Sequence, residues 1–398
     1  MSAGAYRGYG ATQGIFAVES TVNKLADRLS MDPIVLRQKN MIHEGDVMPA
    51  YYGETANSCR LEECLLKASD MIGWKEKGMR TVMPDGKIRA RGVAMAMQGS
   101  SISNCDVGSV TVKLSDEGTY HITVGCTDMG TGCDTIIAQF AADVLETPID
   151  NISVYGVDTD ISPYDSGSYA SSTTYLTGMA AVKACEQLRE RIIALAAVRM
   201  NKDASALTFD GENVIDESDG AKMSLFDIAT ASMCNNEISL EVTYSHSSPV
   251  SPPPFMAACA EIEADPETGA IELLDYTACV DCGTVVNTNL ARVQTEGGLL
   301  QGIGMTLYED IWYDERGKNL SNSFMQYKVP SRLDTDRIRV EFDSSYEPTG
   351  PFGAKSIGEI VINTPAPAIA DAVYNATGVW INELPITPEK ILKGMKVI

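Results

Sequence analysis

The chain has 398 residues, of which 44% are hydrophobic, and its formal net charge is −23. This length and apolar content suffice for the cores of two or more lobes, and the negative charge argues against nucleic acid or an anionic membrane surface as a partner. No apolar run is long enough to span a bilayer, and the N-terminus lacks the basic-then-apolar pattern of a signal peptide, so we expect a cytoplasmic protein.

Three helices are predicted in the N-terminal part of the chain. From Ile15 to Leu29, apolar residues recur at steps of three and four, which predicts an amphipathic helix. A shorter helix is predicted for PIVLRQKN (33–40), and another over about 61–72, after a polar, irregular stretch at about 45–60.

The middle of the chain mixes strands and helices. GSVTVKLSDEGTYHITVG (108–125) alternates across a turn at residues 116–118, which predicts a hairpin. A helix at about 134–145, a strand in NISVYGVDTD (151–160) and a long helix at about 176–199 follow.

The segment SHSSPVSPPP (245–254) is the clearest break in composition, and we expect it to be a connection. After it, the sequence predicts a hairpin over 258–281 that turns at 265–269, then a helix around 292–308. A last helix is predicted to begin at Thr364-Pro365, with Thr364 as N-cap, and to end at Gly378.

These elements predict an α+β fold with mixed sheets, divided into two lobes. The first lobe is expected over 1–244 and the second over 255–398, with a linker at about 245–254 and the lobes interleaved in space.

Cysteine and histidine usage limits the chemistry that we expect. The ten cysteines are scattered through predicted elements and read as reduced, mostly buried thiols. Cys279 and Cys282 form a C-x-x-C pair without a second pair, which is weak support for a metal site. Because the three histidines are isolated in the sequence, we expect a carboxylate as the base of any catalysis.

Three loops of small residues lead into predicted helices. They are YRGYGATQG (6–14), DMGTGCDT (128–135) and DSGSYASSTTY (165–175). Helix N-termini favour anions, and glycine permits close approach, so together the loops suggest a large, phosphate-bearing cofactor. Each loop alone is as well explained by an ordinary tight turn, and MGTG lacks the third glycine of a Rossmann motif.

Glu359 is the candidate base. It precedes the apolar run Ile360–Ile362, and partial desolvation there would raise its pKa towards that of a general base. Composition alone favours the alternative of a glutamate at a strand edge paired with Lys355.

Five segments, in this order, resemble the C-terminal half of the molybdopterin-binding subunit of xanthine dehydrogenase-type molybdenum hydroxylases. The segments are GAYRGYGATQGIFAVESTVNKLADRLSMDPIVLRQKNMIHEGD, GCTDMGTGCDT, YDSGSYASSTTYLTG, ARVQTEGGLLQGIG and GAKSIGEIVINTPAPAIADAV. The resemblance covers essentially the whole chain. It implies the multi-lobed, molybdopterin-binding fold of the aldehyde oxidase/xanthine dehydrogenase type.

The resemblance also implies a chemistry. In the family, molybdenum is held by a pterin dithiolene and carries an oxo, a hydroxyl and a sulfido or selenido ligand. The hydroxyl attacks an electron-poor carbon of an aromatic N-heterocycle or aldehyde, and a glutamate in a V-G-E or I-G-E motif takes its proton. That glutamate matches Glu359, and Arg7 matches a catalytic arginine beside the molybdenum.

Further residues match the cofactor site of the family. The resemblance implies that Ala170 approaches the metal through its backbone, that Ser171 and the loop Gly130-Thr131-Gly132 line the pterin, and that Gln294 hydrogen-bonds the cofactor. The loop departs from the family pattern M-G-Q-G, because Thr131 stands in place of the glutamine.

The substrate positions depart from those of relatives that oxidise xanthine. Tyr9 stands where many relatives have a stacking phenylalanine, and Met95 and Ala96 stand in place of an aromatic residue followed by threonine. These changes argue against xanthine and favour another purine, or a pyridine such as nicotinate.

The family's N-terminal half, with its G-G-x-F-G loop, is not found in this sequence. The resemblance therefore implies a split enzyme of the nicotinate dehydrogenase type. A larger molybdopterin-binding subunit would complete the site, 2Fe-2S and FAD would lie on partner subunits, and the pterin could be the cytosine dinucleotide. The alternatives are an aldehyde-oxidising member and a non-catalytic relative that binds cofactor or partner; a hydrolase using Glu359 and a cysteine would lack a histidine partner.

Overall fold

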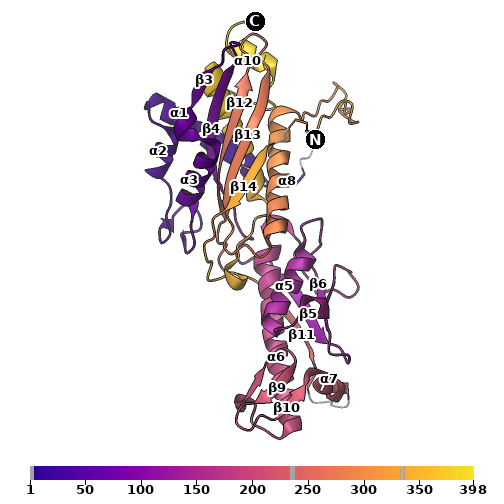
Figure 1. Ribbon diagram of the computed structural model, residues 1–398. Coiled ribbons are helices and arrows are strands. Elements are labelled where there is room, and N and C mark those ends of the chain that lie inside the picture. Colours follow the sequence, from indigo (N-terminus) through magenta and orange to yellow (C-terminus); the bar gives the residue numbers. More distant parts are fainter. Residues whose placement is uncertain (1–3, 234–237, 332, 335–336) are drawn as a thin grey trace. The chain divides into compact units, whose positions relative to one another are not determined.

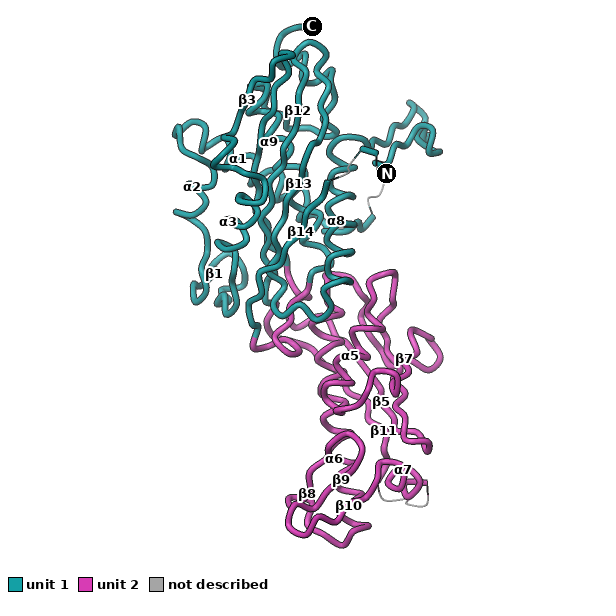
Figure 2. Tube along the Cα trace, in the orientation of Figure 1, with its two compact units in different colours: residues 1–98, 252–347, 357–398 teal, residues 99–251, 348–356 magenta. Residues whose placement is uncertain are grey.

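The computed structural model describes residues 4–233, 238–331, 333–334 and 337–398. They form two compact units, shown in different colours in Figure 2. Unit 1 comprises residues 1–98, 252–347 and 357–398, and unit 2 comprises residues 99–251 and 348–356. One crossing between the units, at 251/252, falls inside the expected linker. The expected first lobe, however, is divided at 98/99, because its first 98 residues pack with the C-terminal half of the chain.

Unit 1 is built on a five-stranded mixed sheet in the order β14-β13-β12-β4-β3, beside a two-stranded sheet of β1 and β2. The strands are β1 (Val47–Met48), β2 (Glu54–Thr55), β3 (Arg80–Val82), β4 (Ile88–Met97), β12 (Phe255–Ala264), β13 (Ile271–Asp281) and β14 (Ile338–Phe342). The helices are α1 (Ala11–Arg28), α2 (Pro33–Gln38), α3 (Leu61–Ile72), α4 (Trp74–Lys77), α8 (Thr288–Leu307), α9 (Pro365–Thr377) and α10 (Pro388–Gly394).

The large sheet of unit 1 is covered on both faces. Strands β4, β12 and β13 run side by side through its centre (Figure 1). Successive residues of β4 show the two faces: Val93 joins a core with α3, whereas Ala94 joins a core with α8 and α9. A strand buried on both faces has no polar face, which explains the nearly unbroken apolar run of β12.

Unit 2 contains a four-stranded mixed sheet in the order β11-β5-β6-β7 and a three-stranded sheet in the order β10-β9-β8. The strands are β5 (Gly108–Leu114), β6 (Tyr120–Val124), β7 (Ile152–Tyr155), β8 (Leu207–Phe209), β9 (Asn213–Asp216), β10 (Lys222–Ser224) and β11 (Glu241–His246). The helices are α5 (Cys133–Leu145), α6 (Gly178–Met200) and α7 (Leu225–Met233), and α6 packs against β5, β11 and α5.

The structure confirms the predicted α+β class and both hairpins, β5–β6 and β12–β13. The predicted helices are present, although α1 begins four residues before Ile15 and α8 four residues before 292. As predicted, Thr364 is the N-cap residue of α9, and Pro365 follows it at the first helical position. The Thr364 side chain makes no cap bond, because Oγ1 accepts a hydrogen bond from Tyr276 (3.0 Å) and donates one to the sulfur of Met256.

Nine of the cysteines are free thiols, and all of these except Cys105 are buried. Cys234 lies outside the described residues. Within the ranges that the structure describes, we find no helix that combines the length and the apolar character needed to cross a bilayer.

Candidate active site

In unit 1, the N-terminal loop brings Arg7 against α8 and the segment that contains Glu359. The Nε atom of Arg7 donates to the carbonyl oxygen of Gly358 (2.5 Å). Its two terminal nitrogens donate to the side-chain oxygens of Gln301 (3.2 Å) and Gln294 (3.1 Å). A further bond reaches the backbone oxygen of Gln294 (3.3 Å), so four neutral acceptors from two other parts of the chain hold the half-buried guanidinium.

Burial and charge act on Arg7 in opposite directions. Burial lowers the pKa of Arg7, and the electrostatic interaction with Glu359 raises it in part. Arg7 contacts Gln294, Gln301 and the backbone next to Glu359, and we call these four residues the Arg7–Glu359 cluster: Arg7, Gln294, Gln301 and Glu359.

Two glycines make the cluster sterically possible. Gly8 has φ +88°, and a Cβ atom there would lie 2.5 Å from Oγ1 of Thr12 and 3.0 Å from Cγ2 of Ile362. In α8, a Cβ atom on Gly298 would lie 2.2 Å from Cγ2 of Val361 and 3.2 Å from Cζ of Arg7. The absence of side chains at these two positions lets the Arg7 loop and α8 approach the segment after Glu359.

Glu359 is half-buried and precedes a short 3-10 turn, Ile360–Ile362, so it does not stand at a strand edge as one alternative supposed. Its Oε2 atom lies 3.5 Å from Nε2 of Gln98, directly after the end of β4. The sequence analysis missed both Gln98 and Gln301. A usable signal for Gln98 was its place as the first polar residue after the apolar run of β4.

The candidate substrate residues do not all join this cluster. Tyr9 is 75% exposed and lies two residues after Arg7. Ala96 is buried in the core shared with α8 and α9, and the half-buried Met95 packs against the α3 side. A substrate-binding role for these three residues stays a prediction.

In unit 2, Asp128 organises the loop that contains Gly130, Thr131 and Gly132. Its Oδ1 atom accepts hydrogen bonds from the backbone N–H groups of Gly130 (2.9 Å) and Gly132 (3.1 Å). Burial would raise the pKa of Asp128, but these donors outweigh it and lower the pKa. The loop ends at the first turn of α5, with Gly132 as its N-cap at φ 76°.

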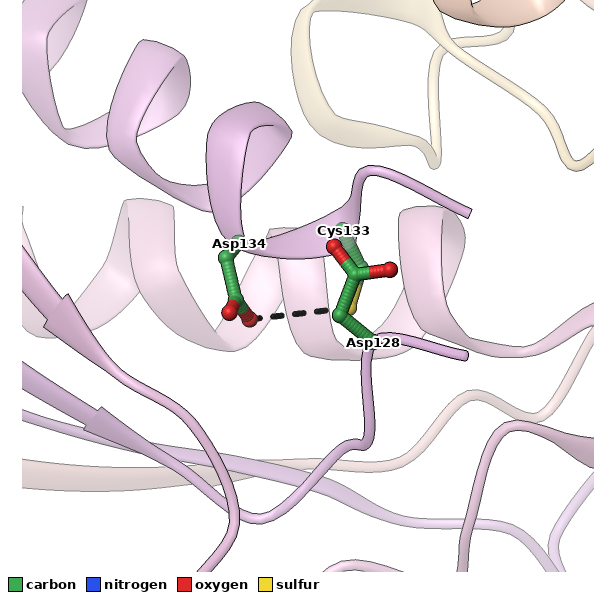
Figure 3. A group of neighbouring side chains, drawn as sticks. All are labelled: Asp128, Cys133 and Asp134. Atoms are coloured by element: carbon green, nitrogen blue, oxygen red, sulfur yellow. Dashed lines mark hydrogen bonds between the residues drawn. The ribbon is translucent and has the colours of Figure 1, made fainter. Parts of the chain in front are cut away.

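Cys133 and Asp134 lie next to Asp128, as Figure 3 shows. One ligand atom from each of the three side chains falls within 4.8 Å of the others. Burial, and next the charge of Asp128, raises the pKa of Asp134. Oδ1 of Asp128 is already occupied by backbone donors, so the trio is explained by its role in shaping the loop.

The loop with Ala170 and Ser171 lies beside the Asp128 loop. Oγ of Ser168 donates to the carbonyl oxygen of Thr127 (3.3 Å). Ala170 and Ser171 adopt φ values of 52° and 56°, a left-handed conformation that costs free energy without glycine and that clusters at ligand sites. Oγ1 of Thr173 is buried without a hydrogen-bond partner among the described residues.

The structure therefore gathers the predicted site residues into two groups, one in each unit. Arg7, Gln294 and Glu359 meet in unit 1, and the loops of Gly130–Gly132 and Ala170–Ser171 meet in unit 2. Each group combines hydrogen-bonding groups with backbone in the left-handed region, the combination expected around a polar ligand.

Family comparisons agree with the resemblance seen in the motifs. A family model described as a molybdopterin cofactor-binding domain matches residues 67–336, and a second model of that description matches residues 1–41.

Three curated relatives match nearly the whole chain. It is 37% identical over 99% of its length to the probable hypoxanthine oxidase XdhD of Escherichia coli (strain K12), covering 42% of that protein. It is 32% identical over 98% of its length to the xanthine dehydrogenase molybdenum-binding subunit of Escherichia coli O157:H7, covering 53%. It is 29% identical over 98% of its length to the 6-hydroxypseudooxynicotine dehydrogenase complex subunit gamma of Paenarthrobacter nicotinovorans, covering 51%.

Solved structures share the fold. The TM-score is 0.89 with reconstituted CO dehydrogenase from Oligotropha carboxidovorans, at 25% identity over 100% of this chain and 53% of that chain. It is 0.88 with quinoline 2-oxidoreductase from Pseudomonas putida 86, at 26% identity over 99% of this chain and 53% of that chain. The chain thus spans about half the length of the relatives that it matches.

Proposed function

The chain belongs to the xanthine dehydrogenase family of molybdenum hydroxylases, whose molybdopterin cofactor-binding domain it carries, and we propose that it supplies the catalytic base of such an enzyme. The enzyme hydroxylates an aromatic N-heterocycle with oxygen derived from water, and Glu359 is the base. The observation that carries this proposal is the Arg7–Glu359 cluster, which joins two family motifs lying about 350 residues apart.

The residues present fit a molybdopterin cofactor. Gly130, at φ 96°, has no atom within 4 Å of a Cβ position, which leaves open space over the loop. The buried hydroxyl of Thr173 is an unused donor near Ala170 and Ser171. A guanidinium and two amides in unit 1 add donors for oxygen-rich groups. The proposed cofactor-binding residues are Gly130, Thr131, Gly132, Ala170 and Ser171 in unit 2. In unit 1 they are Arg7 and Gln294.

Within this proposal the protein positions groups and moves a proton. When bound, the molybdenum centre supplies two-electron redox chemistry. Arg7, held by Gln294, Gln301 and Gly358, places a positive charge beside the reacting groups. Glu359 accepts a proton at a carboxylate oxygen, a task for which an ionised, half-buried carboxylate is suited.

The proposed substrate is a purine or a pyridine-type heterocycle. The relative named hypoxanthine oxidase is 37% identical, whereas an aldehyde oxidoreductase molybdenum-binding subunit is 29% identical. The exposed ring of Tyr9 is available to stack on a flat heterocycle. The proposed substrate roles of Met95 and Ala96 rest on the family resemblance alone. An aldehyde-oxidising enzyme is the second candidate.

The finer composition of the enzyme is also proposed. The rest of the molybdopterin-binding region, on a larger subunit, completes the site, and 2Fe-2S and FAD on partner subunits carry electrons away. The cofactor carries a sulfido or selenido ligand, its pterin is the cytosine dinucleotide form, and the enzyme works in the cytoplasm. A relative named as a subunit of a dehydrogenase complex supports the partner subunits of this proposal.

The Glu359→Gln substitution in the assembled enzyme tests the proposed function. It retains the shape of the side chain and removes the base, so turnover should fall by at least a hundredfold while molybdenum content per enzyme stays normal. The measurements are steady-state kinetics over a panel of purines, pyridines and aldehydes, together with metal analysis.

The matched control is Glu267→Gln, at an exposed turn of the same unit, which should leave the kinetics unchanged. Full turnover by the Glu359→Gln enzyme would show that Glu359 is not the catalytic base. An assembled enzyme without molybdenum would favour a non-catalytic binding role instead.

A further inference from the structure

A chain of side-chain hydrogen bonds connects α1 to Glu359. Oγ1 of Thr12 donates to Oδ1 of Asn363 (3.2 Å), and Nδ2 of Asn363 donates to Oε1 of Gln98 (2.9 Å). Nε2 of Gln98 in turn faces Oε2 of Glu359 at 3.5 Å. All four residues lie in unit 1, and Asn363 is fully buried.

The carboxylate sets the direction of this chain. An ionised carboxylate only accepts hydrogen bonds, so Gln98 must turn its NH₂ group towards Glu359 and its oxygen away. Asn363 must then offer its own NH₂ group to that oxygen, which leaves Oδ1 to the Thr12 hydroxyl. Each amide has one orientation that satisfies both of its neighbours.

We propose that Thr12, Asn363 and Gln98 form a positioning relay that aims a donor at Glu359 and so holds its carboxylate in one orientation. The inference rests on the proposed role of Glu359. It assigns positioning roles to three residues that stand outside the I-G-E and Y-R-G-Y-G motifs.

The relay also connects the N-terminal loop, which carries Arg7, with the segment that carries Glu359. Thr12 lies in the first turn of α1, directly after the loop that carries Arg7, and Gly8 brings that loop against Asn363. Arg7 bonds the carbonyl oxygen of Gly358, the residue before Glu359. The segment of Glu359 is therefore held by the Arg7 guanidinium, and its carboxylate faces the Gln98 amide from the β4 side.

Kinetics of the assembled enzyme test the relay. Gln98→Leu removes the donor and should lower kcat about tenfold with KM and molybdenum content unchanged, because hydrogen bonds to charged groups contribute strongly. Asn363→Asp replaces a donor by an acceptor, so Gln98 should turn and present its oxygen to Glu359, with a loss of kcat at least as large. Adding Gln98→Leu to Asn363→Asp should cause no further loss.

Thr12→Val provides an alternative test if the buried aspartate of Asn363→Asp prevents assembly of the enzyme. It should lower kcat two- to threefold alone and have no effect in the Gln98→Leu background, since it acts through Gln98. The matched control is Gln38→Leu, which removes a similar amide–carboxylate bond, from Gln38 to Glu62 (3.0 Å), elsewhere in unit 1. This control should retain wild-type kcat.

The outcomes separate the relay from the base. Losses that multiply in the double variants, or a Gln98→Leu enzyme with wild-type kcat, would overturn the relay. If either of these results is found while the Glu359→Gln enzyme is inactive, the relay is wrong but Glu359 is still supported as the base. A fully active Glu359→Gln enzyme would overturn the proposed function itself.

Discussion

Gly8 determines where the neighbouring Arg7 side chain lies. Its φ is +88°, and a Cβ atom there would lie 2.5 Å from Oγ1 of Thr12, so the backbone at Gly8 has no room for a side chain. Arg7 can reach Gly358, Gln294 and Gln301 because the backbone beside it lies against the segment that follows Glu359.

A comparison of two glycines in this loop tests that reading. Gly8→Ala should impose both the left-handed strain of about 1–2 kcal/mol and a steric overlap, so it should displace Arg7 and lower activity at least tenfold. Gly10→Ala, at φ +84° but with no atom within 4 Å, should impose the strain alone. Turnover and thermal unfolding of both variants check this. Equal activities would show that the close contact at Gly8 does not position Arg7.

Some residues of the candidate site could be predicted from the sequence, and others could not. Arg7, Gln294 and Glu359 could be selected in advance because each stands inside a motif. Gln98 and Gln301 were not selected. Gln301 stands in the same motif as Gln294, but its role becomes visible only when α8 packs against Arg7. Gln98 gains its role from Glu359, a partner distant in the chain. Thr364 is the N-cap residue, as expected, but its side chain makes no cap bond because two buried side chains occupy its hydroxyl.

Among the elements, α8 connects the core to the cluster. Its buried residues Leu299 and Ile303 join the core under the large sheet, and its Gln294 and Gln301 side chains face Arg7. Gly298 allows this helix to pack directly on the 3-10 turn that follows Glu359. One face of α8 is thus fixed in the core while other residues of the same helix hold Arg7 in place.

The adjacent glycines of α8 allow a matched test of this packing. Gly298→Ala should destabilise the protein by about 1–3 kcal/mol, because its Cβ would overlap Val361. Gly297→Ala points into open space and should stabilise the helix by about 0.5–1 kcal/mol. Thermal unfolding of the two variants measures both effects. A Gly298→Ala protein as stable as Gly297→Ala would mean that α8 can shift away without cost.

For the whole molecule, the excess of acidic side chains is the dominant electrostatic feature. With 54 Asp and Glu against 31 Lys and Arg, mutual repulsion opposes the compact state at neutral pH. Ion pairs such as Glu263 with Lys87 and Arg89 offset it only locally.

Salt should therefore stabilise the full chain. Raising NaCl from about 0.01 M to 0.1 M shortens the Debye length from about 30 Å to 10 Å, so Tm should rise by a few degrees. Sucrose at equal osmolarity, which does not screen charge, is the control. If Tm rises equally in sucrose, or falls in NaCl, charge repulsion does not limit the stability of the protein.

The sequence by itself determined the elements, because helices and hairpins depend on the local periodicity of apolar residues and on turn residues. It also determined the family, because the motif loops are contiguous. Only the tertiary structure decided the division at residue 98, the pairing of Arg7 with α8 and the contact of Gln98 with Glu359. Such contacts join residues roughly 260 to 350 positions apart, and they depend on how whole elements pack, which no local pattern encodes.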